Sequence, residues 1–98
     1  MDRIQAMQIF MRVAQAGSFV RAAETLSLPS STVTSSIKNL ENYLQVRLLN
    51  RTTRRVSLTA EGVQYLAQCQ EILALIEHAE TSLTASVRRP QGRLRVDM

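Results

Sequence analysis

Six of the seven residues from Ser30 to Ser36 carry hydroxyl groups, and a second polar cluster follows at Arg51, Arg54 and Arg55. Hydroxyl groups donate and accept hydrogen bonds, whereas guanidinium groups pair with carboxylates and phosphates. Serine and threonine each cost roughly a few tenths of a kcal/mol relative to alanine inside a helix. A helix with so many hydroxyls is therefore predicted to present them to a polar partner.

Cys69 and His78 are the one cysteine and the one histidine of the chain. A single cysteine excludes an internal disulfide, and neither residue has a Cys or His partner at the spacing of a metal site. The acidic residues are scattered, so the chain offers no recognisable nucleophile with a base and no carboxylate pair. We predict that the protein is not an enzyme and has no cofactor. Cys69 is interpreted as a packing residue and His78 as part of a solvated helix face.

Charge is segregated along the chain, whose formal net charge is +4. Residues 1–58 hold eight basic and three acidic side chains, residues 59–87 hold four acidic and no basic ones, and residues 88–98 hold four basic and one acidic. A basic block favours an anion-binding module, for which nucleic acid is the commonest large partner. Ordinary solvated surface charge is the alternative. The lack of basic residues in 59–87 argues against a helix on anionic lipid.

The length of 98 residues and the hydrophobic content of 45% fit one small domain with an appendage. No apolar run approaches the roughly 18 residues of a membrane span, and the start MDRIQAMQ lacks the apolar stretch of a signal peptide. We therefore expect a cytoplasmic protein with no membrane partner.

Apolar spacing predicts three helices before the arginine cluster. The first, over residues 4–16, ends at Gly17. It is predicted to turn one stripe to the core, with two residues beside it: Ile4, Met7, Met11 and Ala14, then Phe10 and Val13. The second, over residues 19–26, has Ser18 as its N-cap and an apolar face of Phe19, Ala22, Ala23 and Leu26. The third follows Pro29 with the stripe Val33, Ile37, Leu40 and Leu44.

Residues 46–59 change from the helical period to the strand period. Val56 and Leu58 alternate with polar residues, and Leu48 and Leu49 precede a polar turn at residues 52–54, so a short β-hairpin is predicted. Its three arginines have no acidic neighbour, which fits a loop that lies on phosphate. A solvated basic turn is the alternative.

Three helices followed by a β-hairpin make a winged helix-turn-helix, a mainly α fold. In this fold the N-terminal end of the third helix enters the major groove of DNA. The small polar residues predicted to contact DNA are the N-cap of the second helix, Ser18, and five residues of the third helix: Ser30, Ser31, Thr32, Thr34 and Ser35. Capping of the helix by Ser30 or Ser31 is the alternative for either one alone.

A long helix is predicted from its N-cap, Thr59, to Val87, with apolar residues at spacings of three and four. Its stripe runs for about 40 Å, more than a core of about 60 residues can cover. We therefore predict a homodimer through Leu66, Leu73, Ile76, Ala79 and Leu83. A helix folded back on its own domain is the alternative. A pure dimerisation or adaptor module would account for this helix but not for the basic hairpin.

Residues 10–62 resemble the DNA-binding domain of the LysR-type transcriptional regulators. The resemblance rests on AGSFVRAA at residues 16–23, STVTSSIKNLE at 31–41, VRLLNRTTRRVSLT at 46–59 and TAEG at 59–62. It implies a bacterial regulator that acts as a dimer or tetramer and has a small-molecule effector domain after the linker helix. By the same resemblance, bases and phosphates are contacted by Ser30, Ser31, Thr34, Ser35 and Lys38 of the recognition helix, and by Arg51 and Arg54 of the wing.

The segment GRLRVDM at residues 92–98 resembles the first strand of such an effector domain, cut short. We therefore expect a winged helix-turn-helix over residues 1–58, a dimerisation linker helix over 59–87, and a hinge with the start of an effector domain over 88–98. The expected activity is sequence-specific binding of double-stranded DNA in the nucleoid, by a dimer on an interrupted inverted repeat.

The chain departs from the family pattern in the recognition helix. Many members have Gln then Pro where this chain has Ser30 and Ser31, and often Arg where it has Ser35. Arginine is the side chain best suited to bidentate contact with guanine. We therefore expect modest direct base readout, with more weight on thymine methyl groups, bridging water and DNA shape.

Overall fold

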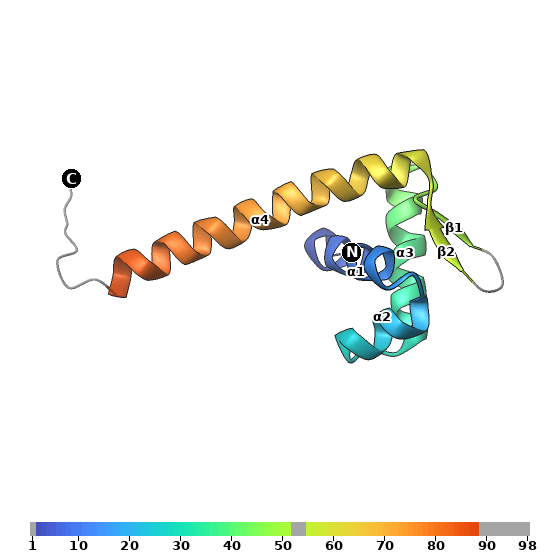
Figure 1. The fold of residues 1–98 in the computed structure, drawn as a ribbon, viewed down its shortest axis with the longest axis horizontal. Coiled ribbons are helices and arrows are strands. Elements are labelled where there is room, and N and C mark those ends of the chain that lie inside the picture. Colours follow the sequence, from blue (N-terminus) through green and yellow to red (C-terminus); the bar gives the residue numbers. More distant parts are fainter. Residues whose placement is uncertain (1, 52–54, 89–98) are drawn as a thin grey trace.

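A computed structural model describes residues 2–51 and 55–88 (Figure 1). Three helices pack into a small bundle, a two-stranded hairpin follows, and a long helix leaves the bundle as a rod (Figure 1). These elements are α1 (Arg3–Ala16), α2 (Phe19–Leu26), α3 (Ser30–Leu44), β1 (Leu49–Arg51), β2 (Val56–Leu58) and α4 (Ala60–Arg88). The predicted winged helix-turn-helix with a long following helix is confirmed.

The residues that were expected to begin and end helices do so. Gly17 adopts the left-handed conformation with φ 69°, and its N–H donates to the carbonyl of Val13 at 2.8 Å. The Ser18 hydroxyl then accepts from the N–H of Arg21 at 3.2 Å, which confirms it as the N-cap of α2. The Thr59 hydroxyl accepts from the N–H of Gly62 at 2.9 Å and caps α4 in the same way. The two hydroxyl caps satisfy backbone donors, and Gly17 satisfies a backbone carbonyl, that helix geometry leaves without a partner.

The core lies where the three short helices meet. Val33, Ile37 and Leu40 of α3 have no exposed surface, as the predicted stripe requires, and Leu44 packs at its edge. Ala22 and Ala23 of α2 are buried against them, with Phe19 and Leu26 half-buried beside. The apolar stripe of α3 is thus entirely inward, which leaves its polar faces to solvent.

The predicted core face of α1 is wrong by part of a turn. The structure buries Ala6, Met7, Ile9, Phe10 and Val13, whereas Ile4 is 40% exposed and Met11 and Ala14 are only half-buried. Phe10 and Val13, placed beside the stripe in the prediction, are fully buried. The physical reason is that α1 packs against α2 and α3 on one side and against α4 on another. Two neighbours require two apolar faces, and Phe10, whose ring lies 5.6 Å from that of Tyr65, serves the contact with α4.

The hairpin is antiparallel, with Leu49 opposite Leu58 and Arg51 opposite Val56. Leu48 and Leu49 are fully buried, so the start of β1 is anchored in the core. This register confirms the predicted hairpin. The turn residues 52–54, including Arg54, lie outside the described residues.

The first half of α4 packs on its own domain. The ring of Tyr65 lies 5.6 Å from that of Phe10 between centroids, Cys69 is fully buried, and Leu66 and Leu73 pack against the core. Burial raises the pKa of the Cys69 thiol. The burial of Tyr65 itself, together with the neighbouring Cys69, raises the pKa of the Tyr65 hydroxyl to about 12. The thiol is therefore protonated at neutral pH, and the interpretation of Cys69 as a packing residue is confirmed.

The second half of α4 extends beyond the bundle (Figure 1), and every residue from Glu77 to Ala85 is exposed. The alternative of a helix folded back on its own domain thus describes the first half only. No helix in the described part of the chain is long and apolar enough to cross a membrane.

The first turn of α4 approaches the backbone of Leu48 closely. The N–H of Thr59 donates to the Leu48 carbonyl at 3.0 Å, and a Cβ added at Gly62 would overlap that same carbonyl oxygen. Glycine at this position therefore permits α4 to leave the hairpin at its observed angle.

Replacement of Gly62 by alanine should lower the free energy of unfolding by about 1–3 kcal/mol, because the methyl group must displace backbone. Gly17 gives a matched comparison, since an added Cβ there meets no atom within 4 Å but φ is +69°. Asparagine tolerates that conformation, so Gly17→Asn should cost less than Gly17→Ala, whereas Gly62→Asn should cost no less than Gly62→Ala. Urea unfolding monitored by circular dichroism measures all four. A Gly62→Ala variant as stable as the parent would contradict the close approach.

Candidate functional site

One face of α3 is polar along its whole length. Ser31, Ser35, Lys38 and Asn42 recur at spacings of four, three and four, and all four side chains are exposed. This period places them on the face opposite the buried stripe. The predicted residues Ser30 and Thr32 are also exposed, in the first turn. The α3 face defined by these side chains is free of bulky groups at its N-terminal end.

The hydroxyls at the start of α3 do not cap the helix. Pro29 is the N-cap residue, and no side chain forms a capping hydrogen bond there. The alternative that Ser30 or Ser31 serves only as a cap is therefore wrong. Thr34 is half-buried and donates its hydroxyl proton to the Ser30 carbonyl at 3.0 Å, so its oxygen remains an acceptor only.

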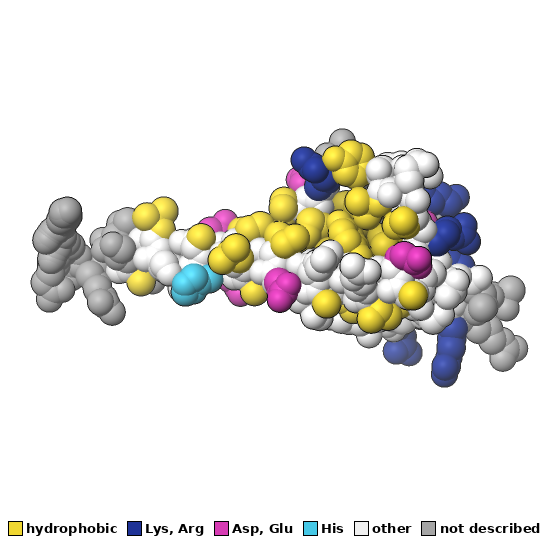
Figure 2. All heavy atoms as spheres, turned by 90° about the horizontal axis from the view of Figure 1, so that it is seen from above, with side chains coloured by type: hydrophobic (Ala, Val, Ile, Leu, Met, Phe, Trp, Pro, Cys, Tyr) yellow, Lys and Arg dark blue, Asp and Glu magenta, His cyan; other side chains and the backbone are white. Residues whose placement is uncertain are grey.

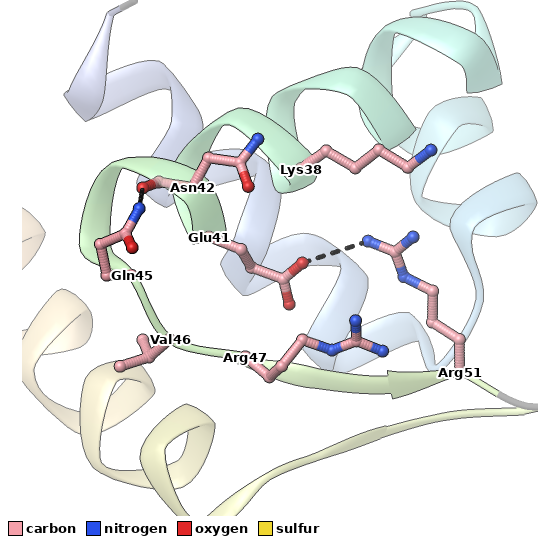
Figure 3. Close-up of a pocket in the computed structure, with 7 residues that line it drawn as sticks. All are labelled: Lys38, Glu41, Asn42, Gln45, Val46, Arg47 and Arg51. Carbon is pink, nitrogen blue, oxygen red and sulfur yellow. Dashed lines mark hydrogen bonds and ion pairs between the residues drawn. The ribbon is translucent and has the colours of Figure 1, made fainter.

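A hollow of about 400 Å³ lies between the C-terminal half of α3 and the chain that leads into β1. We call it the α3–β1 hollow; its lining, drawn in Figure 3, consists of Lys38, Glu41, Asn42, Gln45, Val46, Arg47 and Arg51. Glu41 is 9% exposed at its floor, and one of its carboxylate oxygens accepts from the N–H groups of Leu48 and Leu49 at 2.9 and 3.2 Å. The buried carboxylate thus joins α3 to the start of the hairpin.

Arg51 is held on two sides. One guanidinium nitrogen donates to the second oxygen of Glu41 at 3.4 Å, and the guanidinium carbon lies 5.1 Å from the centre of the Phe19 ring. Its side chain is 29% exposed, so the pair with Glu41 is partly shielded from water. Because Phe19 is the first residue of α2, Arg51 connects all three elements of the polar surface: α2, α3 and the hairpin.

A second hollow lies between α2 and β2 and contains Gly17, Ser18, Arg21, Arg55 and Val56 in its lining. The structure therefore brings the predicted residues Ser18 and Arg55 together, and adds Arg21. Figure 2 shows most Lys and Arg side chains gathered at the end of the molecule opposite the free end of α4. Of these cations, Lys38 belongs to the polar face of α3, and Arg47 and Arg51 line the same hollow as Lys38.

Sequence reasoning placed Lys38 and Arg51 in the site, and the structure brings both to the α3–β1 hollow. The sequence did not indicate three further residues that line the two hollows: Asn42, Arg47 and Arg21. Asn42 could have been found from its spacing of four after Lys38 on the same helical face. Arg47 and Arg21 carry no local signal, because only the packing of the hairpin on α2 and α3 brings them beside the predicted residues.

The predicted dimer residues on α4 divide into two groups. Leu66 and Leu73 pack against the core of their own chain, and Ile76 is half-buried, whereas Ala79 and Leu83 are exposed. The exposed apolar residues that recur at spacings of three and four form what we call the outer stripe: Ile72 (43% exposed), Leu75 (68%), Ala79 and Leu83 (67%). Sequence reasoning missed Ile72 and Leu75 because two adjacent apolar stripes share this helix.

No group of three or more His, Cys, Asp or Glu residues that could hold a metal ion occurs in residues 2–51 and 55–88. The polar surface is instead made of hydroxyl, amide and cationic groups, which bind anions and hydrogen-bonding partners without a metal.

Comparison with known proteins gives a consistent result. Residues 4–63 match the family described as bacterial regulatory helix-turn-helix protein, lysR family. An HTH-type transcriptional repressor of Pseudomonas aeruginosa is 48% identical over 97 residues, covering 99% of this chain and 31% of the relative. The HTH-type transcriptional regulator CrgA of Neisseria meningitidis is 48% identical over 93 residues, covering 95% of this chain and 31% of that protein. The chain thus spans less than a third of the length of these relatives.

Solved structures agree with these matches. The crystal structure of the DNA-binding domain of CbnR in complex with DNA superimposes with a TM-score of 0.82 at 32% identity, over 87% of this chain and 98% of that one. The DNA-binding domain of BenM in complex with benA site 1 DNA gives a TM-score of 0.83 at 25% identity, over 87% and 96% of the two chains.

Proposed function

The chain belongs to the lysR family of bacterial regulatory helix-turn-helix proteins, and we propose that it binds double-stranded DNA as the DNA-binding part of a transcriptional regulator. The observation that carries this proposal is the exposed polar face of α3, with Lys38 on it and with Arg47 and Arg51 beside it. The CbnR and BenM structures, which were solved with DNA, support it because this chain shares their fold.

We place the N-terminal end of α3 in the major groove. Ser31 and Ser35 are small and exposed, so the helix can approach base edges closely. The first turn also carries the positive end of the helix dipole, which favours approach to phosphate. We call the β1–β2 hairpin the wing; its arginines then lie on the adjoining sugar-phosphate backbone of the DNA. We also propose that Arg54, in the turn of the wing, contacts a DNA phosphate, as the sequence predicts.

We further propose that the protein forms a homodimer through α4. The outer stripe leaves Leu75 and Leu83 largely exposed in the single chain, at 68% and 67%. Burial of a leucine side chain contributes about 1.5–3 kcal/mol, so an exposed row of them favours association. The proposed interface is therefore centred on Ile72, Leu75, Ala79 and Leu83, with Ile76 at its edge. A two-fold dimer reads an interrupted inverted repeat.

The wider organisation remains as the sequence predicts it. We propose a DNA-binding unit over residues 1–58, a dimerisation helix over 59–87, and a connection to an effector domain from residue 88. The small-molecule effector, the higher oligomer and the location at the nucleoid in the cytoplasm belong to the whole regulator, and are proposed for it on the basis of family membership.

DNA binding is tested first with random-sequence duplexes at two salt concentrations. Each phosphate contact releases counterions, so affinity should fall steeply with salt, with a logarithmic slope of about −0.9 per contact. A gel-shift titration at 50 and 200 mM salt measures the slope. A protein that binds no duplex at the lower concentration is not a DNA-binding module, and an adaptor role would take precedence.

The polar face of α3 is tested with Ser35→Ala. The change removes an exposed hydroxyl from the helix, so it should alter the sequences enriched from a random DNA pool, with a difference of about 0.5–1.5 kcal/mol at the affected position, the size of one ordinary hydrogen bond. Stability should rise slightly, because alanine is the better helix former. Thr81→Ala removes an exposed hydroxyl from α4 and serves as the control that leaves the enriched sequences unchanged. Identical pools for Ser35→Ala and the parent would exclude a role of this side chain in recognition.

The dimer is tested with Leu75→Asp, which places an unpaired charge in the outer stripe. Since Leu75 is 68% exposed in the single chain, the fold should survive. An uncompensated charge in an interface costs about 3–5 kcal/mol, so the dimer should dissociate more than a hundredfold more readily. Ala67→Asp adds the same charge to another exposed face of α4 and should leave the dimer intact. Sedimentation equilibrium measures both. A parent that is monomeric at micromolar concentration would rule out the interface.

A further inference from the structure

The α3–β1 hollow holds more positive than negative charge. Lys38 comes from α3, Arg47 and Arg51 come from the chain that leads into and forms β1, and Glu41 is the one acidic residue in the lining. Figure 3 shows Lys38 and Arg47 on opposite sides of the Glu41–Arg51 pair. Three cations around one carboxylate leave the hollow with an excess of positive charge.

Glu41 does not neutralise Lys38 or Arg47. One of its oxygens accepts two backbone N–H groups, and the other accepts from Arg51 at 3.4 Å. Within residues 2–51 and 55–88, neither Lys38 nor Arg47 takes part in an ion pair. Two cationic side chains thus reach into one hollow without an anionic partner, which is an arrangement that favours a bound anion.

Arg51 is oriented before any anion arrives. Its guanidinium group has five N–H donors in a planar fork. One of the guanidinium nitrogens donates to Glu41, and the guanidinium carbon lies 5.1 Å from the centre of the Phe19 ring. Arg51 lines the hollow, so its remaining donors are available to an anion that enters it. A group fixed in this way loses little conformational entropy on binding, so its contact with an anion is stronger than that of a mobile surface arginine.

The position of the hollow identifies the anion. It lies between the helix that we place in the major groove and the wing that we place on the adjoining backbone. The sugar-phosphate strand that separates the two grooves must cross between these elements. We propose that the α3–β1 hollow binds one backbone phosphate of the DNA, held by Arg47, Arg51 and Lys38, with the Asn42 side chain as a further donor. This inference rests on the proposed function.

The chemistry of the lining fits a phosphate better than a base. Arginine pairs with phosphate through two parallel hydrogen bonds, and lysine adds a point charge. Such contacts fix the register of the protein on the duplex and carry no sequence information themselves. The hollow is thus a positioning site, which sets how far α3 enters the groove, while the hydroxyl end of the same helix contacts base edges.

The experiment combines a neutralised DNA backbone with protein variants. A set of duplexes carries the sequence enriched by the parent protein, each with one uncharged methylphosphonate at a different backbone position. Arg47→Gln removes one cation of the hollow. The variant should fold, because the Arg47 side chain is exposed and its carbonyl still accepts from the Thr59 hydroxyl at 2.6 Å. Arg12→Gln removes an exposed cation of α1 outside the hollow and is the charge-matched control.

We expect one backbone position in each half-site at which neutralisation weakens binding of the parent by roughly tenfold, the size of a charged hydrogen bond. For Arg47→Gln, neutralising the same phosphate should weaken binding much less, because the guanidinium that pairs with this phosphate is already missing. For Arg12→Gln, neutralisation should weaken binding as much as it does for the parent. Lys38→Gln should show coupling to the same phosphate, since both side chains line one hollow. Circular dichroism confirms that each variant is folded.

The inference is overturned if neutralisation of every phosphate affects Arg47→Gln and the parent equally, because the two changes are then independent. It is also overturned if Arg47 and Lys38 couple to two different phosphates, since one hollow would not then hold a single group. Both results assume a parent that binds DNA with steep salt dependence. A parent that fails the salt titration instead overturns the proposed function, so the two failures are distinct.

Discussion

Glu41 is a carboxylate buried where α3 meets the hairpin, and the polar surface depends on the bonds that it accepts. Two backbone N–H groups at the start of β1 and one guanidinium nitrogen of Arg51 converge on it. Each buried N–H left without a partner costs about 1–3 kcal/mol, so this side chain fixes the direction in which the chain leaves α3. Because Arg51 also lies over Phe19, one carboxylate sets the wing against both helices of the helix-turn-helix.

Much of the fold could be predicted because the decisive residues act locally. Gly17, Ser18, Pro29 and Thr59 begin or end helices through their own backbone preferences or hydroxyls, and need no tertiary contact to do so. The stripe of α3 was also predictable, because its other faces are polar. The orientation of α1 was not, since its apolar residues surround most of the helix. Which of them face the core depends on where α4 packs, a contact more than fifty residues distant.

The same distinction between local and distant causes applies to the candidate site. The hydroxyl-rich end of α3 and the arginines of the hairpin were recognisable from residue type and spacing. Arg47 was not, because it follows α3 in an irregular segment and lines the same hollow as Lys38 only when β1 is anchored by Leu48 and Leu49. On α4, periodicity found apolar residues but could not divide them between the stripe that packs on α1 and the outer stripe.

The attachment of α4 to its own bundle has a consequence for the geometry of the proposed dimer. The α4 helix is joined to the domain through Leu66, Cys69 and Leu73. In the proposed dimer, each α3 would therefore move together with the α4 helix of its own chain. A slip of the two α4 helices by one turn would move the α3 helices by about 5.4 Å, or roughly one and a half base-pair steps of 3.4 Å. Such a shift rotates one α3 helix out of phase with the duplex. In the proposed dimer, the packing of Leu75 and Leu83 across the interface would therefore set the separation of the two α3 helices to the helical repeat of DNA.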